Sequence, residues 1–504
     1  MPIVVLSLEF PLWLRLTHYI NLLFIGLLIR SGIQILAAHP RLYWNNGCTP
    51  RTEWLKFTKK VVPTEPGVIY TAHEDQIAVS PLLGMPGEKN LGMGRHWHGV
   101  SNTLWLLNGV IYVLLLFTTG EWQRLIPTSW SIFPGAWHSL LIYLRFQIPP
   151  LSAFQPYDPL QQLTYAFVVF ILAPAMLLTG AAMSPAIAAS APWYIKLLGG
   201  RQVARSLHFL GMAAFALFTV LHTALVLRVH FRENIANIVL GGPRANFGLA
   251  VAIAVAALLL VFAFYVWSTW YSLGHPRRVQ VALDHLEAPV RRLILHNLAS
   301  GQHYPPSAVS PYFWVNGAPP VAEESPEYAA LLCDDFRDWR LEVGGLVRRP
   351  LSLSLGDLRA LPAQEQTTLH NCVQGWSGVG TWKGVNVSDL LARCEPLPGA
   401  RYLKFTSYGL DQLTYGGKPR RPFYEVLDML LATHPQTILA YDFNGAPLPV
   451  AHGAPLRLRV ETQLGYKMVK YLRSIELVAE YHTSGDGQGG SREDTMFYGR
   501  GAEI

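Results

Sequence analysis

Hydrophobic runs of membrane-spanning length occur in the first half of the chain, before residue 275. In chain order they are Leu12–Leu36, Val100–Thr118, Leu163–Met183, Leu207–Leu227 and Phe247–Trp267. A helix needs about 20 apolar residues to cross a bilayer, so the pattern predicts five transmembrane helices. The first run has neither a basic segment before it nor a small-residue cleavage site after it, which argues against a cleaved signal peptide.

After Gly274 the pattern changes to short apolar segments bounded by turn residues. The alternation predicts strands at 341–347, 402–409 and 456–462, and short helices at 354–362 and 387–394. We therefore expect an N-terminal all-α transmembrane bundle of five helices and a C-terminal α+β domain. The predicted boundaries are 1–275 for the bundle, 276–310 for a linker and 311–504 for the second domain.

Composition supports a membrane protein. Of the 504 residues only 14% are charged and 51% are hydrophobic, whereas about 25% of residues are charged in an average soluble protein. The net charge of +7 comes without a long basic run, so we expect no nucleic-acid partner. The four cysteines include no CxxC pair, which argues against a thiolate-bound iron–sulfur cluster and a c-type haem.

Two histidines, His208 and His222, lie inside the fourth apolar run. An ionisable residue within the membrane is costly and indicates a function. Their spacing of 14 residues falls about 40° short of four turns, so both face one side of the helix, about 21 Å apart along its axis. That spacing suits two haems, one above the other, each bound by one of these imidazoles.

Each haem needs a second histidine from another helix. His18 lies near the start of the first run, and His98 lies at the start of the second, in RHWHG. Because successive spans alternate in direction, His98 and His208 fall at one membrane face and His18 and His222 at the other. We predict two bis-histidine haems with these pairings, with His96 as an alternative to His98. A single histidine in a helix bundle is about as often held by hydrogen bonds as bound to haem iron. Four histidines at matched depths favour haem.

Four segments carry a family resemblance. They are RLTHYINLLF (15–24), AAHPRLYW (37–44), RHWHGVSNTLWLLNGVIY (95–112) and GGRQVARSLHFLGMAAFALFTVLH (199–222). They resemble the prokaryotic di-haem cytochrome b family, which includes membrane subunits of formate dehydrogenase, nickel–iron hydrogenase and thiosulfate reductase. The resemblance covers residues 12–270. It implies two b haems bound by the four histidines, a lipid environment and the quinone pool as electron partner.

A lone cysteine, Cys372, lies in HNCVQGWSGVGTWKGV (370–385). By itself it is more often a packed apolar residue than a ligand. The segment, together with HGAPLRLRVETQLGYKMVKYLRSIELV (452–478), resembles the sulfite oxidase family, in particular its periplasmic protein-methionine-sulfoxide reductase branch. The resemblance covers residues 305–480. It implies a sulfite-oxidase-like domain with molybdenum–molybdopterin, in which Cys372 is the metal ligand, and a soft thiolate suits that metal.

The same resemblance implies the pterin-binding residues. They are Asn316, Ser407, His452, Arg457, Met468, Val469 and Lys470. Arg457 and Lys470 are expected to neutralise the cofactor's phosphate, and His452 stands where the reductase has asparagine.

Two departures from the family pattern bear on the substrate. Sulfite oxidases have an arginine where this chain has Val315, and arginines after the ligand cysteine where it has GWSG. An anion without a partner in a pocket is unfavourable, so we expect a more neutral substrate. His370, two residues before the ligand, is predicted to line the site as a catalytic residue.

These patterns predict a molybdenum oxidoreductase of the prokaryotic cytoplasmic membrane. We expect electron exchange between quinone and a small oxygen-atom donor or acceptor, such as a sulfoxide, through two b haems. The alternatives are a quinone-reducing sulfite dehydrogenase and a haem module with an inactive interaction domain. The resemblance places the molybdenum domain in the periplasm, while the distribution of Lys and Arg among the loops favours the cytoplasm, and we favour the periplasm. The sequence leaves oligomer formation open.

Overall fold

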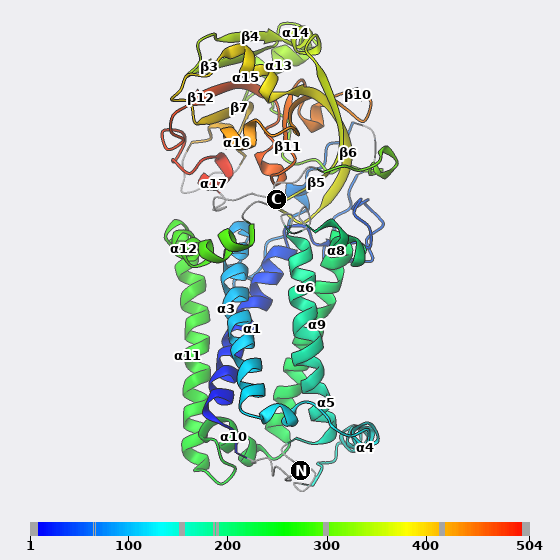
Figure 1. The fold of residues 1–504 in the computed structure, drawn as a ribbon, viewed down its shortest axis with the longest axis vertical. Helices are drawn as coiled ribbons and strands as arrows, with labels where there is room; N and C mark the ends of the chain where they lie inside the picture. Colours follow the sequence, from blue (N-terminus) through cyan, green and yellow to red (C-terminus); the bar gives the residue numbers. More distant parts are fainter. Residues whose placement is uncertain are drawn as a thin grey trace. The chain divides into compact units, whose positions relative to one another are not determined.

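The computed structural model describes residues 9–63, 65, 67–150, 157–184, 187, 191–295, 302–412 and 419–495. The chain forms two compact units (Figure 1). We call residues 1–32, 97–180 and 207–274 the helical unit, and residues 33–96, 181–206 and 275–504 the strand-rich unit. The division does not follow the boundary predicted near residue 275, because segments that connect the apolar helices cluster with the C-terminal strands.

Five apolar helical spans, found among the described residues, confirm the predicted membrane helices. They are α1 (Leu12–Leu36), α3 (Leu91–Thr118), the span Pro159–Met183, α9 (Arg201–Arg228) and α11 (Phe247–Gly274). The third span consists of α5 (Pro159–Phe167), the π-helical turn η3 (Val168–Leu172) and α6 (Ala173–Met183). Pro174 closely follows this π-turn, and such a local change of winding accommodates a proline's missing N–H.

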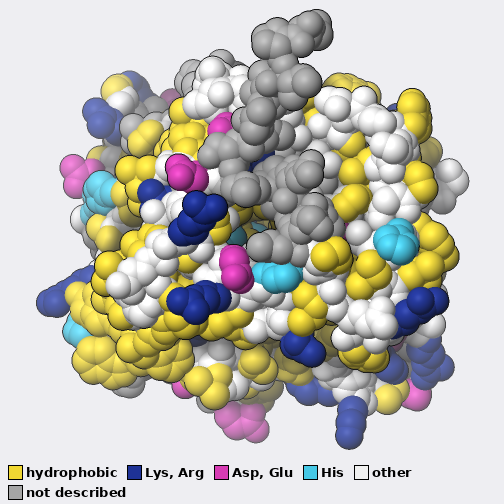
Figure 2. All heavy atoms as spheres, turned by 90° about the horizontal axis from the view of Figure 1, so that it is seen from below, with side chains coloured by type: hydrophobic (Ala, Val, Ile, Leu, Met, Phe, Trp, Pro, Cys, Tyr) yellow, Lys and Arg dark blue, Asp and Glu magenta, His cyan; other side chains and the backbone are white. Residues whose placement is uncertain are grey.

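The outer faces of these helices are apolar. On α11, the large side chains Leu259, Leu260 and Phe262 are 63%, 71% and 62% exposed. Figure 2, which views the molecule end-on from below, shows hydrophobic side chains mixed with scattered charges on that end. A monomer in water rarely exposes so much apolar surface, so these faces suit lipid. Inside the helical unit, by contrast, Asn108 is buried and paired: its Nδ2 donates to Thr17 O at 3.0 Å.

The strand-rich unit contains two five-stranded sheets. The first has the order β10-β9-β6-β5 with β11 also paired to β9, and all its pairs are antiparallel. Its strands are β5 (Ala363–Asn371), β6 (Ser377–Asn386), β9 (Thr437–Phe443), β10 (Ala446–Pro447) and β11 (Arg457–Val460). Cys372 directly follows β5, so the sheet fixes the position of the predicted metal ligand.

The second sheet has the order β4-β3-β12-β7-β8, in which β3 and β12 are parallel. Its strands are β3 (Arg340–Gly345), β4 (Leu351–Ser354), β7 (Tyr402–Leu410), β8 (Pro422–Asp428) and β12 (Leu472–Val478). Buried side chains from both sheets, including Leu341, Phe405 and Leu439, form one core. The predicted α+β class is confirmed, and the three predicted strands are β3, β7 and β11.

Shorter elements complete both units. The two short helices predicted in the C-terminal domain are α14 (Leu355–Arg359) and α15 (Val387–Cys394). The other short helices and strands are β1 (Arg41–Leu42), β2 (Leu55–Lys56), α2 (Ala72–Asp75), α4 (Ile132–Leu144), α8 (Pro192–Leu197), α10 (Phe231–Leu240), α13 (Pro326–Cys333), α16 (Met429–Ala432) and α17 (Ser491–Thr495).

One prediction about the connection is wrong. Residues 276–310 are not simply a linker, because α12 (Pro276–Leu295) forms most of it. Its sequence begins with proline at the first helical position and continues with a helical alternation of apolar and charged residues, both typical of a surface helix.

Candidate functional site

The structure brings the four predicted haem histidines together in the predicted pairs. Within the helical unit, the ring centroids of His18 and His222 lie 6.1 Å apart, and those of His98 and His208 lie 6.3 Å apart. Two imidazole nitrogens each about 2 Å from one metal ion would place their rings about 6 Å apart. Each pair therefore fits a single iron between its rings.

Hydroxyl groups hold three of these histidines by Nδ1. The Nδ1 atoms of His98, His208 and His222 lie 2.9, 3.1 and 3.2 Å from the hydroxyls of Ser31, Thr179 and Tyr165. Such a contact fixes the ring orientation and leaves Nε2 for a metal. No sequence pattern indicated these hydroxyls, which are single polar residues on apolar helices.

Small residues leave room beside the histidine rings. A Cβ atom at Gly180 would lie 3.4 Å from His208 Cε1, and one at Gly32 would lie 3.8 Å from His98 Cε1. His96, the alternative ligand, is engaged elsewhere: its Nε2 lies 3.0 Å from Asp284 Oδ1 and its Nδ1 lies 2.8 Å from Gly92 O. The structure therefore favours His98 over His96.

Cys372 lies in a tight loop between β5 and β6. Its backbone N–H donates to Trp376 O at 3.1 Å, and its Sγ accepts from Asn316 Nδ2 at 3.3 Å and Gln374 N at 3.4 Å. Burial raises the pKa of this thiol to about 11, so a free thiol is protonated at neutral pH. Metal coordination would release that proton and provide the thiolate.

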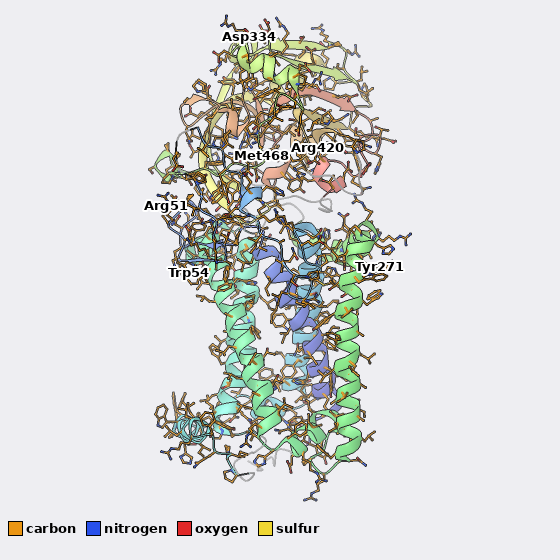
Figure 3. All side chains as sticks on the ribbon, turned by 180° about the vertical axis from the view of Figure 1, so that it is seen from behind. Arg51, Trp54, Tyr271, Asp334, Arg420 and Met468 are labelled. Carbon is orange, nitrogen blue, oxygen red and sulfur yellow. The ribbon has the colours of Figure 1, made fainter. Side chains whose placement is uncertain are left out.

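A pocket adjoins the Cys372 loop. Five of the predicted pterin-binding residues line it: Asn316, Ser407, Arg457, Met468 and Lys470. Figure 3 labels Met468, which lies in the strand-rich unit. Cys372, Val469, His370 and His452 are not among the lining residues, although the Sγ of Cys372 contacts Asn316 directly.

The charges of this pocket suit an anionic ligand. Burial, followed by the neighbouring Arg459, lowers the pKa of Arg457 to about 9. Burial and Arg457 hold the pKa of Lys470 well below its usual value. Arg457 Nε and Tyr471 Oη are buried without a hydrogen-bond partner among the described residues. Arg457 is buried and Lys470 is partly buried, and these two cations beside unpaired donors fit the phosphate of molybdopterin, which would restore their charge balance.

The remaining pterin candidates support these cations. His452 accepts a hydrogen bond from Arg457 Nη1 at its backbone oxygen, at 2.8 Å, and Ser407 Oγ donates to Lys470 O at 2.8 Å. Val469 is fully buried, and its carbonyl accepts from Leu458 N at 2.8 Å. Burial, Lys470 and Arg457 lower the pKa of His452 to about 3, so its ring is neutral at physiological pH.

His370 occupies a buried position behind the loop. Its Nδ1 lies 3.0 Å from Arg459 Nη1, and its ring centroid lies 5.0 Å from that of Trp376. Burial and Arg459 hold its pKa well below the usual value. A neutral ring held between an arginine and an indole suits support of the Cys372 loop, and the predicted catalytic role of His370 stays a prediction.

Residues 33–96 contribute a wall of the pocket, which the sequence did not indicate. His73, Gln76 and Leu91 line it. Ala72 N donates to Val315 O at 2.8 Å, and Gln374 Nε2 donates to Ala72 O at 3.2 Å. Val315, which replaces the family's substrate-binding arginine, is therefore covered by the segment that carries α2.

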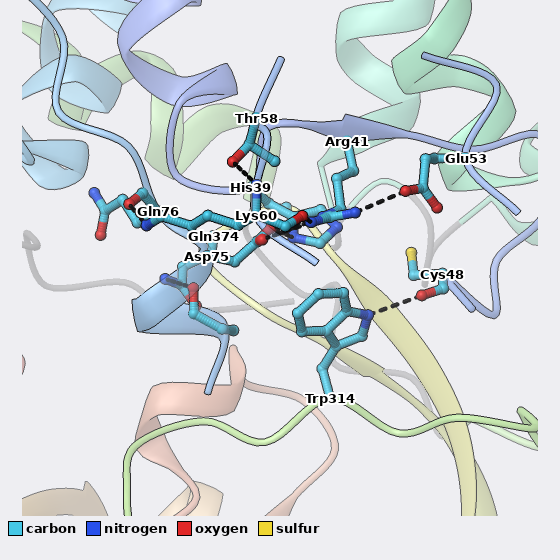
Figure 4. Close-up of polar contacts among 12 residues, drawn as sticks. His39, Arg41, Cys48, Glu53, Thr58, Lys60, Asp75, Gln76, Trp314 and Gln374 are labelled. Atoms are coloured by element: carbon cyan, nitrogen blue, oxygen red, sulfur yellow. Dashed lines mark hydrogen bonds and ion pairs between the residues drawn. The ribbon is translucent and has the colours of Figure 1, made fainter. Parts of the chain in front are cut away.

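A buried ion network fastens this wall (Figure 4). Arg41 is 2% exposed and contacts Asp75 Oδ1 at 3.0 Å and Glu53 Oε1 at 2.7 Å. Nearby, Trp314 Nε1 donates to Cys48 O at 2.8 Å. Asp75 belongs to α2 and lies between His73 and Gln76, so the network positions two residues that line the pocket.

The first turns of α9 hold the Cys372 loop from another side. Gln202 Nε2 donates to Gly375 O at 2.9 Å and to Ser377 Oγ at 3.1 Å, and Arg201 Nη1 donates to Asn371 Oδ1 at 3.3 Å. Gly375 has φ +111°, a conformation that L side chains rarely adopt. The loop therefore depends on a glycine and on contacts from a distant part of the chain.

Arg492 also lines the pocket, with its Nη1 2.6 Å from Asp411 Oδ1. It belongs to α17, beyond the segments that resemble the sulfite oxidase family, so the resemblance could not indicate it. The pocket thus has a cation on this side although Val315 replaces the family's arginine.

Two known families match different parts of this chain. Residues 9–242 match the family described as prokaryotic cytochrome b561. Residues 329–485 match the oxidoreductase molybdopterin-binding domain. The chain thus combines a segment that matches cytochrome b561 with a segment that matches a molybdopterin-binding oxidoreductase domain, and its described residues include five helices long and apolar enough to cross a membrane.

Its relatives include reductases of protein methionine sulfoxide. A protein of Azospira oryzae assigned as protein-methionine-sulfoxide reductase subunit YedZ1 is 37% identical over 147 residues, which are 29% of this chain and 52% of the relative. The catalytic subunit MsrP of Xanthomonas axonopodis is 38% identical over 144 residues, 28% of this chain and 45% of the relative. The chain therefore spans about half the length of these relatives.

Among solved structures, the sulfane dehydrogenase SoxCD from Paracoccus pantotrophus has 21% identity to this chain. The match covers 38% of this chain and 46% of that structure's chain, with a TM-score of 0.26.

Proposed function

We propose that this protein takes electrons from a membrane quinol and uses them to reduce a small sulfoxide or related X=O compound at a molybdenum site. The observation that carries the proposal is the pocket that adjoins the Cys372 loop and is lined by two cations, Arg457 and Lys470. The relatives named for methionine-sulfoxide reduction support this substrate class. The reaction is a two-electron reduction: the sulfoxide takes up two electrons and two protons, its S=O bond breaks, and a thioether and one water molecule form.

Each residue of the pocket then has a defined role. Cys372 would supply the protein thiolate to molybdenum, with Asn316 and the Gln374 N–H donating to its sulfur. Arg457 and Lys470 would hold the phosphate of molybdopterin. When bound, the molybdenum cofactor supplies two-electron oxygen-atom transfer chemistry.

The wall from residues 33–96 would contact the substrate. His73 and Gln76 both line the pocket and offer hydrogen-bond donors to an X=O oxygen. Burial, followed by the nearby Lys89 and Arg492, lowers the pKa of His73, so its ring is neutral at pH 7 and donates from one nitrogen. A neutral donor suits a dipolar sulfoxide oxygen better than a dianion, which needs charged partners.

Electrons would reach this site through two b haems. The His18–His222 and His98–His208 pairs are each spaced for one iron. The alternation of helix direction along the chain favours the order quinol, His18–His222 haem, His98–His208 haem, molybdenum. The protein would reside in the prokaryotic cytoplasmic membrane with its molybdenum domain in the periplasm, as expected from the sequence resemblance.

One observation favours a second candidate, a quinone-reducing sulfite dehydrogenase. Arg492 lines the pocket and offers a cation to an anionic substrate. In that case electrons would flow from molybdenum to quinone. The reductase has stronger support, because Arg492 is already paired with Asp411 and Val315 stands at the family's anion-binding position.

A paired assay decides between these directions. The purified protein is supplied either with a reduced viologen dye and methionine sulfoxide or with sulfite and ferricyanide. We expect turnover in the first assay and little in the second, and Cys372→Ser should abolish turnover while leaving the haem absorbance unchanged. Sulfite oxidation faster than sulfoxide reduction would reverse the assignment, and no molybdenum in the purified protein would exclude both.

A further inference from the structure

The helix α12 has two different faces. On one face, Val279, Gln280 and Leu283 are buried. This face is also fixed by polar contacts, because Arg277 Nη2 donates to Glu493 O at 2.8 Å and Asp284 Oδ1 lies 3.0 Å from His96 Nε2. The position and rotation of α12 within this unit are therefore set by both apolar and polar contacts.

The opposite face is exposed along its described length. Exposed side chains recur at residues 278, 281, 282, 285, 286 and 289, the three- and four-residue spacing of a single helical stripe. We call these six residues the α12 stripe. Val281 is 44% exposed and Leu286 is 62% exposed. The stripe combines these apolar side chains with the cation Arg278 and with His285, and it contains no acidic residue.

The sequence just before α12 marks a membrane boundary. Trp267, Trp270 and Tyr271 lie in the last turns of α11, and both tryptophans are more than half exposed. Figure 3 labels Tyr271 at this end of the helix. Tryptophan and tyrosine gather where a membrane meets water. Only His275 separates the end of α11 from the start of α12, so α12 begins within a few residues of the lipid headgroups.

We propose that the α12 stripe is a binding surface for anionic phospholipid headgroups. Val281 and Leu286 enter the boundary between headgroups and acyl chains, and Arg278 binds phosphate. An amphipathic helix with mixed basic and apolar residues is suited to that layer. Three observations favour lipid over a protein partner: continuity with a membrane-spanning helix, the aromatic residues at the junction, and a charge that complements anionic lipid. The proposal does not depend on the proposed enzyme activity.

The test uses the full-length protein in nanodiscs of phosphatidylcholine and phosphatidylglycerol. A nitroxide label is placed at Leu286→Cys in a Cys333→Ser background, because Cys333 is the exposed native cysteine and the other three are buried. The matched control is Leu430→Cys on α16, a leucine 80% exposed in the same unit. Collision of each label with oxygen, which partitions into lipid, and with a water-soluble nickel chelate is measured by power saturation.

We expect oxygen to reach the label at residue 286 readily, and collision with the nickel chelate to be about tenfold lower than at residue 430, as for groups buried in a bilayer interface. Haem absorbance and molybdenum content serve as checks that each variant is folded. Equal access of the chelate to both labels would show that the stripe faces water and would overturn the proposal. Exclusion of both reagents from residue 286 would show that protein covers this residue, and that result would also overturn the proposal.

Replacing the anionic lipid by a neutral one separates the electrostatic contribution to lipid binding from the apolar contribution. In nanodiscs of phosphatidylcholine alone, access of the nickel chelate to residue 286 should rise severalfold, because attraction between Arg278 and anionic headgroups is lost. Arg278→Gln in the mixed nanodiscs should produce a similar rise. If neither change alters access of the chelate, the stripe does not bind anionic headgroups.

Discussion

Replacement of Arg41 by glutamine should destabilise the strand-rich unit strongly. Arg41 is 2% exposed, and its two carboxylate partners, Asp75 and Glu53, have side chains that are 0% and 6% exposed. Arg41→Gln removes the charge that compensates both. Breaking a buried ion pair in this way costs about 3–5 kcal/mol, because the remaining charges stay buried. For a unit of this size, with an unfolding entropy of about 2.1 cal/mol/K per residue, such a loss lowers the unfolding temperature by roughly 4–8 °C.

Thermal unfolding followed by tryptophan fluorescence measures this effect, and an exposed ion pair provides the matched control. Arg349 and Glu395 lie 3.3 Å apart with side chains 71% and 40% exposed, so Arg349→Gln should cost less than about 1 kcal/mol. In the double variant Arg41→Gln/Asp75→Asn, the loss should be smaller than the sum of the two single losses by about 1–3 kcal/mol. Equal shifts for Arg41→Gln and Arg349→Gln would refute the reasoning.

The remaining predictions concern cofactors, electron flow and pH. His208→Ala should lose about half of the haem in a pyridine haemochrome assay, whereas substitution of the surface residue His285 should lose none. His98→Ala should still accept electrons from quinol but should fail to pass them to sulfoxide in stopped-flow spectra, and an unaltered rate would contradict the proposed haem order. Lys470→Gln should lower the molybdenum content with the haem content unchanged. The pKa of His452 is lowered to about 3, while that of an unfolded histidine is near 6.5, so the cofactor-free protein should lose about 1–2 kcal/mol of stability as the pH falls from 7.5 to 5. His452→Asn should reduce this loss, and an unchanged pH dependence would show that folding does not lower the pKa of this ring.

The pairing of the four candidate haem histidines could be predicted because it follows from helix geometry. His208 and His222 lie on one apolar run, and the alternation of helix direction assigns each a partner. The hydroxyls that hold their rings could not be found in this way. Ser31, Thr179 and Tyr165 are ordinary residues of apolar helices until the fold brings each to an Nδ1 atom.

At the proposed molybdenum site, the pattern of residues alone favoured a packed thiol for Cys372, and only the family resemblance indicated a ligand. That resemblance covers the pterin side of the pocket and says nothing of the opposite wall. His73 and Gln76 line that wall because long-range contacts, such as that of Ala72 N with Val315 O at 2.8 Å, dock the 33–96 segment there. Nothing local in the sequence signals such a contact. The helix α12 was missed for a related reason, since a half-covered helix has the mixed composition of a linker.

Anaerobic reoxidation of the haems by substrate tests the central claim, that one chain connects b haems to a molybdenum site. The purified protein is reduced with dithionite, freed of excess reductant and mixed with methionine sulfoxide while the haem absorbance is recorded. We predict that sulfoxide reoxidises the haems of the native protein and that the haems of Cys372→Ser, equally reduced at the start, stay reduced. Haems of a molybdenum-replete native protein that remain reduced in the presence of sulfoxide would contradict the account.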